Sequence, residues 1–305
     1  MSAPSFEKSL QDIVGSQNVR PDEPLVEHTT FRIGGPAQWL VTPRSEDEVA
    51  GVVSTCEAAG IPWRVLGLGS NVLAPDEGLD GVTLLLADNF AAVEVLPGGL
   101  VRAAAGATNA AVAAARDAGL AGYEFASGIP GTIGGAAIMN AGAYEGQFSD
   151  VAVEVRCLVP SEGSWRVANV PAPEAAWGYR LSRMMRESWV VLGATLQLRA
   201  DSPAAIAARM EELRERRESK QPLEMPSAGS TFKRPEGHFA GALIQEAGCQ
   251  GLRMGGAQVS EKHAGFVVNT GDATAADVLA LIAEVQRRVH ETTGVQLEPE
   301  VRLWQ

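Results

Sequence analysis

Three short segments in the second half of the chain hold side chains that could transfer a proton or bind a carboxylate. In PSAGSTFKRPEGHFAG, Ser230 lies near three basic residues, Lys220, Lys233 and Arg234. A hydroxyl in such surroundings can protonate a carbanion, because neighbouring positive charge stabilises the alkoxide left behind. On spacing alone, a serine–threonine turn with solvated lysines is the simpler interpretation.

The other two segments carry an arginine and an alternating charge pattern. Arg180, in WGYRLSRM, offers a planar guanidinium that matches a carboxylate, although a lone arginine is most often a surface residue. In VQLEPEVRLW, Glu298, Glu300 and Arg302 are spaced two apart, so an extended backbone would place them on one face. Such a face is also typical of a solvated edge strand.

Two glycine-rich stretches allow a large ligand to approach the main chain closely. In GLGSN, Gly67 and Gly69 let successive N–H groups face one anion, and Ser70 and Asn71 add side-chain donors. The stretch lacks the third glycine of a dinucleotide fingerprint and the Gly-Lys-Ser/Thr ending of a P-loop. It is either a pyrophosphate-binding turn or a plain tight turn between strands.

The second stretch, ASGIPGTIGGAAIMNAGAYEG, favours a pyrophosphate-binding role. It holds more glycines than a turn requires, namely Gly128, Gly131, Gly134, Gly135, Gly142 and Gly146. Glycines at this density allow either main-chain contact with phosphates or the close packing of a helix against a sheet. Two such stretches in one chain favour a bulky dinucleotide as the ligand.

Composition limits the classes of function. The 305 residues and 46% hydrophobic content indicate an ordinary globular protein of two or three packed units. The net charge of -12 argues against nucleic-acid binding, because it would repel a phosphate backbone. Cys56, Cys157 and Cys249 lie far apart, so we expect reduced thiols and no metal site. No run reaches about 18 apolar residues, so we expect a cytoplasmic protein without membrane insertion.

Local patterns predict a chain of the α+β class. Ser45 and Glu48 begin a helix that Gly60 ends, and Pro203 begins a longer helix that ends before Pro222. Further helices are expected at 108–119, 238–248 and 274–294, and strands at 63–66, 82–86, 100–106, 151–159, 189–198 and 264–269. The strands are not spaced regularly enough for a doubly wound sheet.

Several motifs occur in one order between about His28 and Arg302. They are HTTFRIGGPA, GLGSNVL, SGIPGTIGGAAIMNAGAY, GYR, PSAGSTFKRPEGHFAGALIQEAG, GGAQVSEKHAGFVVN and LEPEVR. Together they closely resemble the family of UDP-N-acetylenolpyruvoylglucosamine reductases, flavoenzymes of bacterial peptidoglycan synthesis. The resemblance implies an FAD-binding domain of the vanillyl-alcohol-oxidase (PCMH) type in two α+β subdomains, followed by a separate α+β substrate-binding domain. We expect these three parts at residues 1–88, 89–200 and 201–305.

The resemblance also implies where the cofactor binds. Residues 67–71 should hold the FAD pyrophosphate, and residues 127–136 should form the other wall of the site. The cofactor-binding residues expected on this basis are Gly67, Leu68, Gly69, Ser70, Asn71, Ser127, Gly128, Ile129, Pro130, Thr132, Gly134, Gly135, Ala136 and Asn140.

In this family NADPH reduces FAD and leaves, and the vinyl β-carbon of the enolpyruvyl nucleotide sugar then takes hydride from the flavin. By resemblance, Arg180 and Glu300 would stabilise the enolate-like intermediate, and Ser230 would protonate it. Since a carboxylate would repel a developing anion, Glu300 must be protonated or act through Arg180. Lys220 and Lys233 are the expected substrate contacts.

The sequence departs from the family pattern at one position and leaves two other functions open. Arg234 stands where relatives of the longer class have asparagine, and the chain is similar to the short class that lacks a tyrosine-bearing loop over the nucleotide. We expect the C-terminal domain to close as a lid on a monomer that binds only small molecules. An oxidase of the same fold and a non-catalytic nucleotide-sugar sensor stay open. The first lacks a His- or Cys-anchored flavin motif, and the matching positions of Arg180, Ser230 and Glu300 argue against the second.

Overall fold

The computed structural model describes residues 3 to 108 and 110 to 304. The chain divides into two compact units, and it passes between them repeatedly. The first unit comprises Met1–Pro21, Trp39–Leu68 and Gly81–Arg216, and the second comprises Asp22–Gln38, Gly69–Asp80 and Arg217–Gln305. The three-part division expected at 1–88, 89–200 and 201–305 follows from the family resemblance, not from the compactness of the units, and it stays a prediction.

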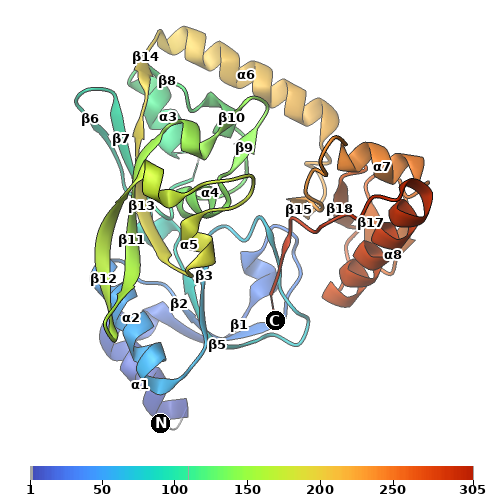
Figure 1. Cartoon of the computed structure of the whole chain (residues 1–305). Helices are drawn as coiled ribbons and strands as arrows, with labels where there is room; N and C mark the ends of the chain where they lie inside the picture. The colour runs from blue at the N-terminus through green and yellow to red at the C-terminus, as the bar shows by residue number, and fades with distance from the viewer. Residues whose placement is uncertain (1–2, 109, 305) are drawn as a thin grey trace. The chain divides into compact units, whose positions relative to one another are not determined.

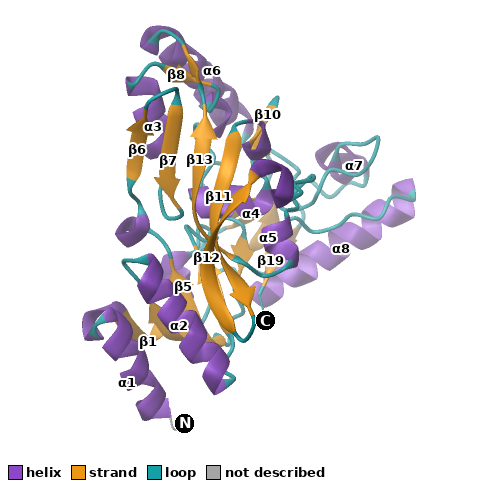
Figure 2. Ribbon diagram, turned by 60° about the vertical axis from the view of Figure 1, so that its left-hand side comes forward, coloured by secondary structure: helices purple, strands orange, loops and turns teal. Residues whose placement is uncertain are grey.

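An antiparallel five-stranded sheet forms the centre of the first unit (Figure 2). Its strands in spatial order are β12 (Ser164–Pro171), β11 (Ala152–Ser161), β13 (Val190–Gln197), β7 (Leu100–Ala104) and β6 (Val93–Leu96). Successive side chains of a strand point to opposite faces, so such a sheet can be buried on both sides.

Both faces of this sheet are buried. On β11, Val155 and Cys157 belong to the core of one face, whereas Leu158 belongs to the core of the other. Helices α3 (Ala110–Asp117) and α4 (Ile133–Met139) cover the first face, and α4 contributes the buried residues Ile133 and Ala137.

The second face of the sheet packs against the N-terminal helices. In α1 (Ala3–Val14), Phe6, Leu10 and Val14 are spaced four apart and are fully buried, as expected for the inner stripe of a helix. Helix α2 (Glu46–Ala59) begins where predicted, because Ser45 Oγ accepts a hydrogen bond from Glu48 N at 3.2 Å. It ends at Gly60, whose φ of 66° is left-handed.

The chain also forms a four-stranded sheet and several short elements (Figure 1). The sheet has the order β1 (Val19–Pro24), β2 (Pro36–Val41), β5 (Leu79–Leu85) and β3 (Trp63–Leu66). The short elements are β8 (Leu120–Ala121), β9 (Gly142–Ala143), β10 (Gly146–Gln147), α5 (Arg183–Arg186) and β14 (Arg199–Ala200). Helix α6 (Pro203–Lys220) follows β14 and contains the boundary between the units.

The second unit is built on a smaller antiparallel sheet. Its strands in spatial order are β15 (Ser227–Ser230), β18 (Phe266–Asn269), β17 (Ala257–Val259) and β16 (Arg253–Met254). Helices α7 (Ala240–Glu246) and α8 (Ala275–Thr293) pack with it around one core. The inner face of α8 supplies a buried stripe at helical spacing, namely Val278, Leu281, Ile282, Val285 and Val289.

Helix α8 is capped twice at its N-terminus. Thr274 and Asp277 form a capping box, and Gly294 ends the helix in a left-handed conformation. In addition, the carboxylate of Asp76 accepts hydrogen bonds from Ala275 N at 2.7 Å and from Ala276 N at 3.1 Å. A segment that follows the first glycine stretch is thus fastened to a helix that supplies six of the buried residues of this core.

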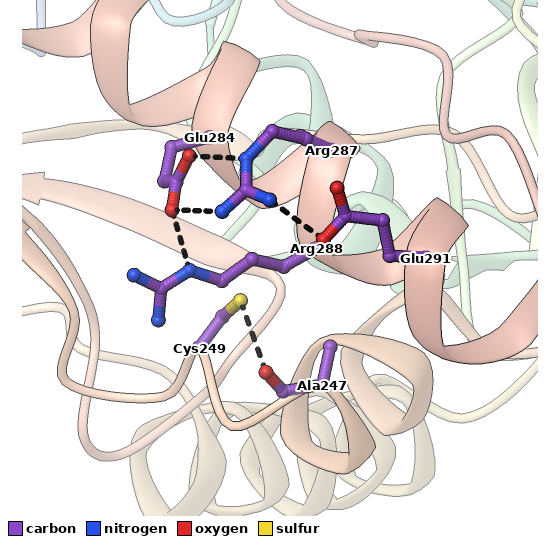
Figure 3. A network of polar contacts seen from close by, with 6 residues as sticks. All are labelled: Ala247, Cys249, Glu284, Arg287, Arg288 and Glu291. Atoms are coloured by element: carbon purple, nitrogen blue, oxygen red, sulfur yellow. Dashed lines mark hydrogen bonds and ion pairs between the residues drawn. The ribbon is translucent and has the colours of Figure 1, made fainter.

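The solvent side of α8 carries an ion-pair network (Figure 3). Glu284 accepts hydrogen bonds from Arg287 and Arg288, and Arg287 also contacts Glu291 at 2.6 Å. The hydrogen bonds from the two arginines lower the pKa of Glu284 to about 2. Cys249 lies beside this network but is fully buried, and burial raises the pKa of its thiol. The network therefore keeps its charges into the acid range, and the thiol stays protonated.

Most expected elements are confirmed, with some differences at their ends. The strand expected at 82–86 begins earlier, at Leu79, and continues through Gly81, where a Cβ atom would lie 2.0 Å from Pro62 O. The helix expected at 108–119 is described as α3, and Asn109 lies outside the described residues. Helix α1 and strand β12 had no counterpart among the expected elements.

The described residues include neither a membrane-spanning helix nor a metal-binding group of side chains. None of the helices is both long and apolar enough to cross a membrane. In the same part of the chain, no three His, Cys, Asp or Glu side chains are grouped so that they could hold a metal ion.

Candidate functional site

The two glycine-rich stretches meet in the first unit at Gly67 and Thr132. A Cβ atom on Gly67 would lie 2.6 Å from Thr132 Oγ1, so only glycine permits this approach. Thr132 is in turn fixed as the N-cap of α4, because its Oγ1 accepts a hydrogen bond from Gly135 N at 3.3 Å. The structure therefore brings the two predicted stretches into contact.

The second stretch is tied to the end of strand β7. Ile133 N donates to Ala107 O, and Gly134 N donates to Ala105 O, both at 2.8 Å. A Cβ atom on Gly134 would lie 3.0 Å from Ala105 Cβ, which explains the need for a small residue at this position. These bonds set the position of the loop that precedes α4.

An ion-pair cluster holds the other end of that loop. Arg209, on α6, donates to Glu124 and to Asp201, each at 2.7 Å. Glu124 is only 11% exposed and also accepts a hydrogen bond from Gly122 N at 2.6 Å. Sequence reasoning missed this cluster, because its members lie up to 85 residues apart in the chain.

The loop at 127–132 offers donors for a pyrophosphate. Among the described residues, the N–H groups of Gly128, Gly131 and Thr132 donate to no protein acceptor. Gly128 and Gly131 have φ values of 76° and 157°. Main-chain N–H groups are strong donors that need partners, and a row of them in a glycine turn is typical of anion sites. The loop therefore fits the pyrophosphate of the expected FAD.

The first stretch continues into the second unit at Gly69. Its φ is 64°, and a Cβ atom there would lie 2.2 Å from His28 O, so the position requires glycine. The side-chain amide of Asn71 donates to Glu300 O at 3.4 Å. Of the neighbouring predicted residues, Leu68 is 41% exposed and Ser70 is half-buried.

The remaining predicted cofactor residues lie in the second stretch. Ser127, Ile129 and Pro130 precede α4, Gly135 and Ala136 lie in its first turn, and Asn140 follows its end. Asn140 is 2% exposed, and its side chain contacts Gln147, Gly178 O and Ser149 N. In this structure its side chain therefore holds neighbouring turns, and its cofactor contact stays a prediction.

Arg180 occupies a tight turn beside the end of α4. Its Nη1 donates to Asn140 O at 3.4 Å, and its Nη2 donates to Gly142 O at 3.2 Å. The guanidinium lies 5.0 Å from the centre of the Tyr179 ring. Arg180 has a φ of 53°, a left-handed conformation that is uncommon for residues other than glycine and costs about 1 kcal/mol.

Two neighbours of Arg180 fasten its turn to α4. Trp177 Nε1 donates to Ala137 O at 2.7 Å, and Ser182 Oγ donates to Ile138 O at 2.8 Å. The last carbonyl groups of a helix have no partner within it, so these side chains satisfy them. The sequence WGYRLS thus places its arginine through hydrogen bonds to the helix that follows the second glycine stretch.

A backbone hydrogen bond joins the segments that carry Ser230 and Glu300 in the second unit. Ser230 is exposed at the end of β15, where it pairs with Phe266 of β18. The next residue, Thr231, is buried, and its carbonyl oxygen accepts a hydrogen bond from Glu300 N at 2.8 Å. The C-terminal segment then continues as β19 (Arg302–Leu303), parallel to β4 (Val72–Leu73).

The basic residues near Ser230 have separate partners. Lys233 Nζ contacts Glu298 Oε2 at 3.1 Å, and Lys233 N donates to Glu298 O at 2.9 Å. Arg234 lies over the exposed ring of Phe239, 4.0 Å from its centre. Lys220 is exposed at the end of α6. The expected surface of Glu298, Glu300 and Arg302 is thus partly used in pairing with the serine loop.

His263 is a further residue of this region, and no sequence pattern indicated it. It lies in the turn before β18, and its Nδ1 accepts a hydrogen bond from Gly265 N at 3.1 Å. Burial lowers the pKa of the ring, and the charge of Lys220 acts in the same direction. A lone histidine between a lysine and an alanine gives no sequence signal for such a position.

One open cavity of about 730 Å³ lies elsewhere in the first unit. It is lined mainly by β11 and β12, together with Arg183, Glu187 and Trp189. Arg156 at its edge is paired with Glu46 and Asn169, and Arg183 with Glu187. No predicted site residue lines this cavity.

Two family models match the chain. The FAD binding domain model matches residues 37–169, and the model of the UDP-N-acetylenolpyruvoylglucosamine reductase C-terminal domain matches residues 221–304. The first covers the glycine stretches and the second covers Ser230 and Glu300.

Relatives match over nearly the full length. The UDP-N-acetylenolpyruvoylglucosamine reductase of Clostridium perfringens is 46% identical over 299 residues, covering 98% of this chain and 97% of that protein. The corresponding reductase of Lachnoclostridium phytofermentans is 47% identical over 300 residues, covering 97% and 96%. The crystal structure of the Thermus caldophilus reductase has a TM-score of 0.78 at 36% identity, covering 94% and 100%. The expected α+β fold, with a PCMH-type FAD-binding domain followed by a separate C-terminal domain, is confirmed.

Proposed function

This chain belongs to the family of UDP-N-acetylenolpyruvoylglucosamine reductases, and we infer that it reduces the enolpyruvyl group of that nucleotide sugar, with NADPH as electron donor and FAD as cofactor. The reaction serves the synthesis of peptidoglycan precursors. The observation that carries this inference is identity of 46–47% over at least 97% of the chain, through the parts that hold both glycine stretches and the serine loop. We place the reaction in the cytoplasm and in a monomer of the short class, as expected from the sequence.

FAD, when bound, supplies the hydride that the substrate receives and that NADPH restores. The protein has to bind the two ligands and to control charge and protons on the substrate. We assign the pyrophosphate to the N–H groups of Gly128, Gly131 and Thr132, together with residues 67–71. The support is that these three donors have no acceptor within the described part of the chain.

Arg180 and Glu300 are proposed to stabilise the charge that develops on the substrate. When hydride adds to the vinyl β-carbon, the electron pair of the double bond moves to the α-carbon and its carboxylate. A guanidinium can bind that carboxylate through two parallel hydrogen bonds. Its planar fork already contacts two carbonyl oxygens in this structure, which supports a role in binding oxygen atoms. Glu300 acts either as a protonated acid or through Arg180.

Ser230 is proposed as the general acid that protonates the α-carbon. Its exposed position at the end of a paired strand and the bond between Thr231 O and Glu300 N support this role. General acids contribute about 10²- to 10⁴-fold to a rate. Lys220 and Lys233 are proposed to bind the phosphates of the nucleotide sugar, with Lys233 leaving its contact to Glu298.

An anaerobic absorbance titration tests the whole reaction. NADPH should bleach the yellow protein, and UDP-N-acetylenolpyruvoylglucosamine should restore the colour. Restoration by oxygen alone would instead support an oxidase, and the absence of bound flavin would contradict the role of the glycine loops.

The Ser230→Ala variant tests the general acid. Bleaching by NADPH should stay within about twofold of the unmodified protein, while reoxidation by the nucleotide sugar should slow by about 10²- to 10⁴-fold. Ser227→Ala is a matched control, since Ser227 begins the same strand β15. Equal slowing of both half-reactions in the Ser230 variant would remove Ser230 from this role.

A further inference from the structure

We propose that His263, as a neutral ring that accepts the Gly265 amide proton, is the positioning residue for the proton donor Ser230. This inference rests on the proposed role of Ser230. It concerns the turn between β17 and β18, which lies beside the strand that ends in the serine.

A short chain of hydrogen bonds connects the histidine ring to the serine strand. Gly265 N donates to His263 Nδ1 at 3.1 Å, and Gly265 O accepts from Thr231 N at 2.8 Å. The N–H group of Gly265 therefore binds the histidine ring, and its carbonyl oxygen binds Thr231, the residue that follows Ser230. Any displacement of Gly265 will move the end of β15.

The ring and Gly265 are also in close contact. A Cβ atom on Gly265 would lie 3.0 Å from His263 Cε1 and 3.2 Å from Nδ1, so a side chain there would push the ring away. On its other side the ring packs edge-on against Phe266, with 4.9 Å between the ring centres. Ser260 Oγ accepts hydrogen bonds from Lys262 N and His263 N and so fixes the start of the turn.

The hydrogen bond to Gly265 decides the protonation state of the ring. Because Nδ1 accepts the hydrogen bond from Gly265 N, it carries no proton of its own. The neutral ring is therefore protonated at Nε2. The positive charge of Lys220 disfavours protonation of the ring. Gly241 of α7 and Phe266 of β18, which are uncharged, also lie close to the ring. The neighbouring Lys262 points to Glu218 O, at 2.8 Å, and to Glu224, at 3.7 Å.

The sign of the pH dependence follows. Burial lowers the pKa of His263 in the folded protein below the usual 6.5, so folding favours the neutral ring. Its contribution to stability is complete above the unfolded pKa and is lost as the pH falls through the lower folded pKa. A proton on Nδ1 breaks the bond to Gly265 N and releases Thr231 and Ser230. Reoxidation by the nucleotide sugar then slows at acid pH, whereas reduction by NADPH does not.

Two substitutions separate acceptance of the amide proton from titration. His263→Asn keeps an acceptor oxygen at the place of Nδ1 but cannot be protonated, and His263→Phe keeps an aromatic ring but no acceptor. In the unmodified protein, substrate-dependent reoxidation should decline as the pH falls through the lowered pKa of His263, and the asparagine variant should not show this decline. In the phenylalanine variant reoxidation should be slow, by about tenfold or more, at every pH. His290→Asn, on α8, is the control and should leave the pH profile unchanged.

Amide hydrogen exchange gives a readout that does not depend on the chemistry. The amides of Gly265 and Thr231 should exchange about tenfold faster in His263→Phe than in the unmodified protein, and His263→Asn should restore slow exchange. Unchanged exchange in His263→Phe, or an acid decline that persists in His263→Asn, would overturn the positioning role. If Ser230→Ala leaves reoxidation unchanged while the exchange results hold, the proposed function of Ser230 fails and the link from His263 to the strand stands.

Discussion

The contact between the two glycine stretches predicts that Gly67→Ala destabilises the unmodified protein but does not destabilise a variant that lacks the Thr132 side chain. In the unmodified protein, Gly67→Ala places a Cβ atom 2.6 Å from Thr132 Oγ1 and 3.2 Å from Thr132 Cγ2. Thr132 cannot turn away without losing its hydrogen bond from Gly135 N, and β-branched side chains have few rotamers. Overpacking of this kind costs about 1–3 kcal/mol of unfolding free energy.

Removing the threonine side chain removes the clash. Thr132→Ala alone loses the N-cap of α4, at a cost of about 1 kcal/mol. In that background the new Cβ atom of residue 67 would lie 3.5 Å from the Cβ atom of residue 132, which is an ordinary van der Waals contact. Gly67→Ala should then be neutral or stabilising by about 0.4–1 kcal/mol, because alanine narrows the unfolded ensemble. The double-mutant cycle should therefore show a coupling of about 1–4 kcal/mol, the difference between the two effects.

The assay is urea unfolding of the four proteins, with FAD affinity measured in parallel by recovery of flavin fluorescence. Gly69→Ala in both backgrounds is the control, because its Cβ would meet the main-chain His28 O at 2.2 Å and its φ is 64°. It should destabilise by a similar amount with or without the Thr132 side chain. A cycle that is additive within about 0.5 kcal/mol would refute the proposed clash between Gly67 and Thr132.

Two further results are expected. Asp76→Ala should lower the free energy of unfolding by about 1 kcal/mol, because Ala275 N and Ala276 N at the start of α8 lose their acceptor. Asp76→Asn keeps an acceptor oxygen and should retain most of this stability. Equal losses in both variants would contradict capping by the carboxylate. The three cysteines should not react with a thiol reagent in the native protein at pH 8, since all are fully buried and burial raises the pKa of Cys56 and of Cys157 to about 12; mass spectrometry of the native and urea-unfolded protein checks this, and rapid labelling of the native protein would count against it.

Local sequence signals predicted the elements whose causes are local. Ser45 and Gly60 bound α2, and Thr274 and Gly294 bound α8, because caps act within one turn of the residues they satisfy. The buried stripe of α8 follows from its period of apolar residues. Strand β12 was not predicted. It lies at the edge of the sheet beside β11, and its alternation of exposed and inner positions shifts by one residue between Val167 and Ala168.

The candidate site divides in the same way. Residue types and order were enough to indicate a dinucleotide, and resemblance to a family selected Arg180, Ser230 and Glu300. Neither could show that Asn71 and Thr231 contact Glu300, at sequence separations of 229 and 69 residues, or that His263 supports the serine strand.

The amino-acid sequence alone thus sets the caps, the buried stripes and the glycines that allow close approach, because these depend on steric limits and hydrogen bonds within a few residues. The tertiary structure decides which donors remain open in the glycine loop and which side chains are already engaged in internal bonds. Those outcomes depend on partners such as Ala105, Arg209 and Gly265, which reach their places only when distant segments have packed.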